Sequence, residues 1–163
     1  MGEKFEISRV FAAPRDRVWD AWTKPEQFAR WFGPKGTKSQ VKHFELRPGG
    51  YLHSRLEGED GSVSRGKNVY REIDAPRRLV WEQGFSNETA EIVPAPFPMP
   101  WPLLMLTTVL FEDEGASTRV TLTWEPIDAT KEQLESFAKI LSSMTDGWTG
   151  TFVQLDEFLA SDQ

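Results

Sequence analysis

Apolar residues recur every three or four positions near the end of the sequence, and this stripe constrains the fold more than any other feature. The positions are Leu134, Phe137, Leu141, Met144, Trp148, Phe152, Leu155 and Leu159. Such spacing places every one of them on the same face of an α-helix. The pattern predicts one helix of about thirty residues, about 45 Å long, that lies across a larger apolar surface.

The two ends of this stripe add detail to the prediction. Thr130 and Gln133 match a capping box ahead of the first apolar residue. Gly147 and Gly150 interrupt the helical sequence beside Trp148, at a cost of up to about 1 kcal/mol each relative to alanine. We expect these glycines to allow close approach by a strand or a ligand, with a kink between two shorter helices as the alternative.

The preceding residues predict a sheet that this helix can cover. Strand-like runs separated by turn residues occupy 5–11, 41–47, 51–57, 66–73, 79–85, 103–111 and 118–124. Two short helices, each opened by a proline, follow the first run. Consecutive strands with short turns favour an antiparallel meander. We therefore predict an α+β fold over residues 1–163, in which a curved antiparallel sheet of about six to seven strands wraps one long C-terminal helix and leaves a cavity beneath it.

The composition limits the classes of function. With 163 residues, 39% of them hydrophobic, the chain suffices for a single domain with a sizeable core. The net charge of −6 argues against nucleic acid or an anionic membrane as a partner. There is no cysteine, and the first residues lack the apolar segment of a signal peptide. We expect a cytoplasmic protein with no membrane span and no cofactor.

The sequence contains no recognisable catalytic or metal-binding constellation. Nucleotide-binding, serine-hydrolase and zinc-protease motifs are all missing. The two histidines, His43 and His53, flank a predicted hairpin turn at 48–50 and are too few for a metal site. Arg9 shares its strand face with apolar neighbours, so we expect a carboxylate partner for it, Glu45 or Glu82.

A polar strand face offers a candidate ligand anchor. In the run 51–57, His53 and Arg55 lie on one face, whereas the even-numbered residues lie on the other. If the polar face points inward, Arg55 could bind a ligand carboxylate, with His53 beside it. If it points outward, both are solvated surface residues.

The aromatic residues provide candidate cavity walls. Seven tryptophans are present. We expect Trp81 on a strand, together with Met144, Trp148 and Phe152 on the helix, to line the cavity, although core packing alone would also account for any one of them.

Alternate prolines mark a candidate cavity mouth at 94–102. A proline at every second position removes the backbone donors from one side of an extended segment, so this stretch cannot be a central strand. Its other side chains include Phe97, Met99 and Trp101, which would share a face. We predict a stiff lid over the cavity mouth or a contact in a homodimer; a plain connecting loop is the alternative.

Several stretches, taken in order, resemble a known family. They are Ala13-Pro14, Val18-Trp19, Ala21-Trp22, Trp31-Phe32-Gly33-Pro34, Leu46 to Gly50, Glu72 to Trp81, Thr118 to Leu122 and Gly147-Trp148. The chain is similar to bacterial proteins related to the C-terminal domain of the activator of the ninety-kilodalton heat-shock chaperone ATPase. That group belongs to the START-like, helix-grip superfamily, which includes the birch-pollen allergen and polyketide cyclases. The chaperone-binding N-terminal domain of the activator has no counterpart here, and the proline segment is unlike the connection expected in the family.

The resemblance implies the helix-grip fold and three possible functions. The first is binding of a small hydrophobic or amphipathic molecule between sheet and helix. The second is a chaperone-associated interaction protein, and the third is a cyclase or hydrolase that uses the same cavity.

Overall fold

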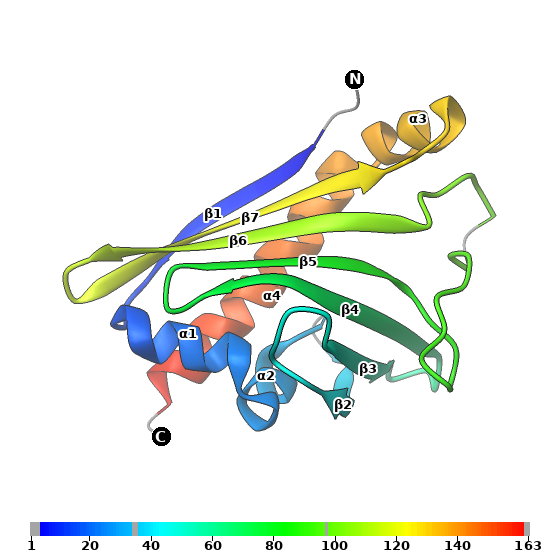
Figure 1. The fold of residues 1–163 in the computed structure, drawn as a ribbon. Helices are drawn as coiled ribbons and strands as arrows, with labels where there is room; N and C mark the ends of the chain where they lie inside the picture. Colours follow the sequence, from blue (N-terminus) through cyan, green and yellow to red (C-terminus); the bar gives the residue numbers. More distant parts are fainter. Residues whose placement is uncertain (1–3, 34–35, 97, 162–163) are drawn as a thin grey trace.

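The protein is an antiparallel sheet whose concave side carries a long C-terminal helix (Figure 1). The computed structural model describes residues 4–33, 36–96 and 98–161. In chain order the elements are β1 (Phe5–Phe11), α1 (Arg15–Thr23), α2 (Pro25–Trp31), β2 (Lys38–Phe44), β3 (Tyr51–Glu57), β4 (Val63–Asp74), β5 (Arg78–Phe85), β6 (Leu104–Glu114), β7 (Ser117–Ile127), α3 (Lys131–Lys139) and α4 (Leu141–Ala160). The predicted α+β helix-grip fold is confirmed.

Strands β2 to β7 form the predicted antiparallel meander, and β1 pairs with the edge at β7. The order is β1-β7-β6-β5-β4-β3-β2, and all neighbours are antiparallel. β1 pairs with β7, so the first and last strands in the sequence are neighbours in the sheet, and Phe5 lies opposite Trp124. His43 lies opposite His53 across the predicted β2–β3 hairpin, and Gly49 turns the chain at φ 86°.

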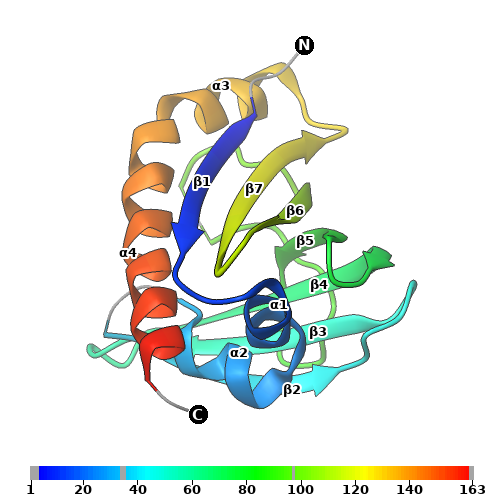
Figure 2. The same cartoon turned by 90° about the vertical axis from the view of Figure 1, so that its left-hand side faces the viewer.

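The C-terminal stripe forms two helices rather than one, so the thirty-residue rod predicted above is wrong in detail. α3 ends where Ile140 leaves helical geometry, at φ −112° and ψ 20°, and its N–H bonds to Phe137 O, three residues back. This tightened last turn redirects the chain, and α4 leaves α3 at an angle (Figure 2). The predicted capping box is present at Thr130 and Gln133.

The break does not fall at the glycines. Gly147 and Gly150 lie inside α4, and a Cβ added at either would meet nothing within 4 Å. Of the two expected explanations, close approach by a strand is therefore wrong, and close approach by a ligand stays a prediction. α4 alone, with 20 residues, spans the sheet, running from α3 to the neighbourhood of α1 and α2 (Figure 2).

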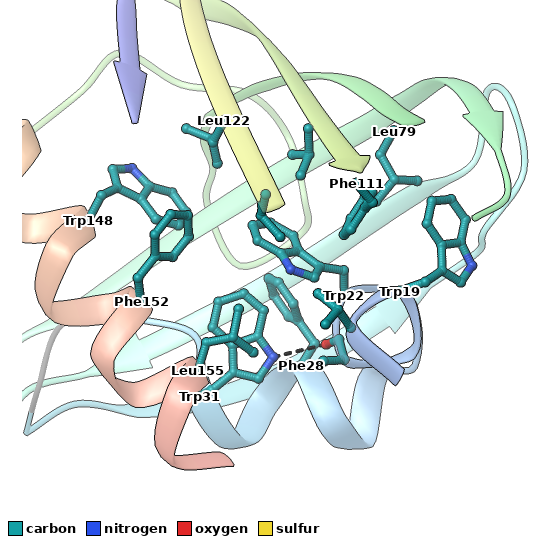
Figure 3. Close-up of a cluster of buried hydrophobic side chains, with 14 of the residues drawn as sticks. Trp19, Trp22, Phe28, Trp31, Leu79, Phe111, Leu122, Trp148, Phe152 and Leu155 are labelled. Carbon is teal, nitrogen blue, oxygen red and sulfur yellow. Dashed lines mark hydrogen bonds between the residues drawn. The ribbon is translucent and has the colours of Figure 1, made fainter. Parts of the chain in front are cut away.

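A solid aromatic cluster fills the space between the sheet and the C-terminal half of α4 (Figure 3). Trp22 of α1 lies at its centre, with ring centroids 4.8 Å from Trp31, 5.9 Å from Phe111 and 6.5 Å from Phe152. Phe152 and Leu155 are fully buried. Trp31 is fixed by an Nε1–H bond of 2.9 Å to Ala21 O. α1 and α2 thus act as the floor of a packed core at this end.

Arg9 has a different partner from the two carboxylates expected. It donates from Nε to Asp156 of α4 at 2.8 Å and forms an ion pair with the same oxygen at 2.6 Å. Glu45 bonds instead to His43 and Arg47, and Glu82 to Arg71. The prediction failed because it considered only strands, whereas α4 crosses the same face of β1. Both side chains are about one third exposed, so the pair is worth less than a buried one.

Candidate functional site: the cavity beneath the N-terminal half of α4

The N-terminal half of α4 covers a cavity instead of a packed core. Its volume is about 370 Å³, within the range of small-molecule sites in proteins. Four parts of the chain form its boundary: α4, the inner face of β3 to β7, the end of the β5–β6 connection, and Phe32-Gly33 after α2. One sheet and one helix therefore enclose both a solid core and a hollow.

The helix wall is made by Met144, Gly147, Trp148 and Thr151. Trp148 divides the hollow from the core. Its ring stacks on Trp22 at 6.5 Å on the core side and meets Trp124 edge-to-face at 5.8 Å. Thr151 Oγ1 bonds to Gly33 O at 3.2 Å and so ties this wall to the segment after α2. The wall is therefore held by ring packing and by this hydrogen bond.

The sheet wall is mixed, with polar and apolar side chains on one concave surface. Met105, Trp81 and Trp124 supply the apolar part. Most polar residues of this wall are uncharged, namely Ser54, Ser64, Asn68 and Gln83, and Arg65 is the charged one. Gly66 lies among them, and a Cβ added there would be 3.7 Å from Ser54 Oγ, which shows that this position faces the cavity.

Gln83 is held in one orientation by two hydrogen bonds. Trp81 Nε1 and Thr107 Oγ1 both donate to its Oε1, each at 2.8 Å. Trp81 and Gln83 are two residues apart on β5 and so share its concave face. Asn68 lies directly opposite Gln83 on β4. The middle of the sheet wall therefore carries two neighbouring amides.

The end of the proline segment forms the rim of the cavity. Trp101, Pro102 and Leu103 line it, and the Trp101 ring packs on Phe137 of α3 at 5.9 Å. Gly84 permits this placement, because a Cβ there would come within 2.6 Å of Leu103 O. Met99 is 38% exposed and does not line the cavity, and Phe97 lies outside the described residues.

Most of the helix and strand side chains predicted to form the cavity walls do line the cavity. Trp81, Met144 and Trp148 line the cavity, with Trp101 at its rim. Phe152 does not: it is fully buried in the aromatic cluster behind Trp148.

The polar face of β3 points away from the cavity. Leu52 and Ser54 are buried, and Ser54 and Leu56 line the hollow, so the even-numbered residues face inward. Arg55 bonds instead to Glu57 Oε1 at 3.2 Å on the convex side. The structure thus gives no support to Arg55 as an anchor for a bound carboxylate.

His53 is buried on the convex side under the segment that follows β5. Only 5% of it is exposed, and its Nε2 lies 3.1 Å from Asn87 O, which makes Nε2 the protonated donor. Burial lowers the pKa of His53, and the nearby charges of Arg65 and Lys67 lower it further, against the opposing effect of the Asn87 carbonyl. His53 is therefore neutral near pH 7 and holds the connection that leads into the proline segment.

The cavity offers binding groups but few groups for acid–base chemistry. Arg65 is the one ionisable residue among those that line it, and its guanidinium lies 3.9 Å from Glu88. Across residues 4–33, 36–96 and 98–161, no group of three or more metal-ligating side chains occurs. Within the same ranges, no helix is both long and apolar enough to cross a bilayer.

Sequence reasoning missed the polar residues of the sheet wall. Ser54, Asn68 and Gln83 sit on strands without any motif around them. One signal was available: Gln83 follows the predicted wall residue Trp81 by two positions, which places both on one strand face.

Comparison with known proteins identifies the relatives of this chain. The family described as "Activator of Hsp90 ATPase homolog 1-like protein" matches residues 12–160. A search of curated proteins found no match. Among the solved structures similar to this chain are three bacterial proteins. Protein Ms6760 from Mycobacterium smegmatis is 24% identical, with 98% of this chain and 92% of the other covered and a TM-score of 0.79. A protein from Arthrobacter aurescens is 29% identical, with 96% and 86% covered and a TM-score of 0.79, and a protein of the same family name from Silicibacter pomeroyi is 15% identical, with 97% and 98% covered and a TM-score of 0.74.

Proposed function

The chain belongs to the Activator of Hsp90 ATPase homolog 1-like family, and from that premise we propose that it binds a small, largely apolar molecule in the cavity beneath α4. Trp81, Met144 and Trp148 form the walls of the binding site, and Trp101 forms its rim. The single observation that carries this proposal is the cavity of about 370 Å³ with an aromatic wall and a few polar side chains.

Packing energetics supports the proposal. Protein interiors are close-packed, and a space of this size forgoes the contacts that a filled core would make. The other half of the same interface is occupied by a cluster of buried aromatic side chains that includes Trp22, Trp31 and Phe152. The chain therefore has residues able to fill such a space and leaves one half open, which favours a ligand as the missing contact.

The two other functions suggested by the resemblance receive less support. A partner surface would gather exposed apolar side chains, but the large ones in the described residues are spread over β1, β4, the β5–β6 connection and α4: Val10, Val63, Met99, Leu103 and Val153. A cyclase or hydrolase would need a positioned acid or base, and the lining supplies only Arg65, which faces Glu88.

A neutral fluorescent probe, N-phenyl-1-naphthylamine, tests the proposal. Wild-type protein should bind it in a 1:1 complex with a blue-shifted, enhanced emission. The variant Gly66→Leu places a side chain in the cavity, because its Cβ meets only Ser54 Oγ at 3.7 Å and Gly84 O at 3.8 Å. We expect at least tenfold weaker binding with an unchanged or higher melting temperature, since glycine weakens a strand interior.

Gly150→Leu is the matched control. It adds the same side chain at a position where a Cβ would meet nothing within 4 Å, but Gly150 does not line the cavity. This variant should bind the probe as wild type does. Equal probe affinity in Gly66→Leu and wild type would refute binding in this cavity.

A further inference from the structure

The amide of Gln83 has a defined orientation, and this determines what it offers to a ligand. Indole Nε1 can only donate a hydrogen bond, so the Gln83 atom 2.8 Å from Trp81 Nε1 must be the oxygen. The Thr107 hydroxyl donates to the same oxygen at 2.8 Å. Both lone pairs of Oε1 are therefore used, and the planar amide cannot flip without breaking a buried bond.

The other end of this amide is a donor with no partner. Gln83 Nε2 makes no hydrogen bond to any part of the chain that the structure describes. Nε2 is absent from the set of fully buried nitrogen and oxygen atoms without a partner, so this unpaired nitrogen is not fully buried. Gln83 itself lines the cavity. An oriented N–H group is thus available inside an otherwise largely apolar space. A hydrogen bond formed there gains from the low local dielectric.

The surroundings of Gln83 carry no charge on the cavity side. Its cross-strand neighbour Asn68 is a second amide, and Ser54 and Ser64 are hydroxyls. The charged lining residue, Arg65, lies near Glu88 at 3.9 Å. Transfer of an ionised group into such a site is costly, whereas a carbonyl or ether oxygen needs only one donor.

Building on the proposed function, we propose that Gln83 is the specificity-determining residue of the cavity, and that its Nε2–H binds an acceptor oxygen on an uncharged, apolar ligand. The ligand class is a neutral ketone, ester or ether with an aromatic or aliphatic body. The body packs against Trp148 and Met144 on the helix, while the oxygen is held at the sheet. A carboxylate ligand is disfavoured.

Two ligands that differ only at the acceptor test this assignment. Benzophenone and 1,1-diphenylethylene have the same shape, but the first has C=O where the second has C=CH₂. Calorimetric affinities for both are measured in wild type, Gln83→Glu and Gln83→Met at pH 8. In Gln83→Glu the carboxylate still accepts from Trp81 and Thr107 but donates nothing, and in Gln83→Met both functions are lost.

The measured quantity is the affinity ratio of ketone to alkene. Because each ligand's cost of leaving water is common to all three proteins, the change in this ratio isolates the Gln83 contact. We expect the ratio to fall about fivefold to tenfold in both variants, as expected for one hydrogen bond of about 1 kcal/mol. In wild type, the side-chain ¹⁵N–¹H signals of Gln83 should shift with benzophenone and much less with the alkene.

Each outcome separates this assignment from the proposed function. If both ligands bind wild type and the ratio is the same in all three proteins, the cavity binds ligands but Gln83 does not select them. If neither ligand binds, the cavity proposal fails as well. Tighter binding of 4-benzoylbenzoate than of benzophenone, lost in Arg65→Gln, would overturn the uncharged ligand class.

Discussion

The two halves of the space beneath α4 are built from the same elements and end up differently. The C-terminal half is closed by α1 and α2, whose Trp22 and Trp31 reach up to meet Phe152 and Leu155 (Figure 3). Among the described residues no helix lies beneath the N-terminal half, and its sheet wall carries small or polar side chains such as Ser54, Gly66 and Asn68. The difference shows that the hollow arises from what is missing below the helix, not from the helix itself.

On α4, the side chain at the boundary between the halves is Trp148. Trp148 touches Trp22 and Phe152 on one side and borders the cavity on the other. A ligand in the hollow would therefore rest against the surface of a rigid core. Such preorganisation reduces the entropy lost on binding.

The largest expected effect compares one truncation in each half. Phe152→Ala should lower the free energy of unfolding by about 3–5 kcal/mol, because it opens a void in a closed aromatic cluster. Met144→Ala, two turns earlier on α4, should cost less than about 2 kcal/mol because one side of Met144 already faces the cavity. Urea unfolding of both variants measures this, and equal losses would show that the halves do not differ in packing.

The next effect compares the two amides of the sheet wall. Gln83→Met leaves the buried donors Trp81 Nε1 and Thr107 Oγ1 without an acceptor, which should cost about 1–3 kcal/mol. The Asn68 side chain makes no hydrogen bond within the described residues, so Asn68→Leu should be neutral or stabilising. Thermal and urea unfolding distinguish them; a larger loss in Asn68→Leu would contradict the roles given to these residues.

A smaller effect concerns the glycines of α4. Gly147→Ala and Gly150→Ala should each raise stability by about 0.5–1 kcal/mol, since both are helix-interior positions with free space for a Cβ. Any loss of stability would mean that α4 bends in solution. If Gly147→Ala alone weakens probe binding, Gly147 is part of the access route to the hollow.

The smallest effect is a pH dependence on the convex side of the hollow half. The pKa of folded His53 lies below its unfolded value near 6.5. Between those two values the unfolded chain binds more protons, so stability is full above pH 6.5 and declines as the pH falls toward the folded pKa. His53→Gln should flatten this part of the profile of melting temperature against pH. The same slope in both proteins would assign it to other groups.

The pattern of side chains predicted the fold but not the division into halves. Period-two runs and the helical stripe were enough to predict the sheet and its covering helix, because burial of one face determines each. The apolar residues of the stripe have the same spacing from Leu134 to Leu159, so the stripe could not predict that Met144 faces a hollow and Phe152 a core. That distinction depends on which side chains rise from α1, α2 and the strands.

Contacts that are distant in sequence explain the remaining errors. Arg9 and Asp156 are separated by 147 positions, and the break at Ile140 follows from local backbone geometry rather than from a glycine. The role of Gln83 depends on the hydrogen bonds by which Trp81 and Thr107 orient its amide, and the sequence does not predict these bonds. Alternation predicts which residues share a strand face, but which face of β3 points into the cavity depends on the arrangement of the whole sheet.

The most direct test of the central claim uses two methionines on opposite walls of the hollow. Met105 of β6 and Met144 of α4 both line the cavity, whereas Met99 is exposed outside it. With ¹³C-methyl methionine labelling, bound N-phenyl-1-naphthylamine should give intermolecular NOEs to Met105 and Met144 together and none to Met99. NOEs confined to Met99, or binding without any NOE to the two wall methyls, would contradict a ligand site between sheet and helix.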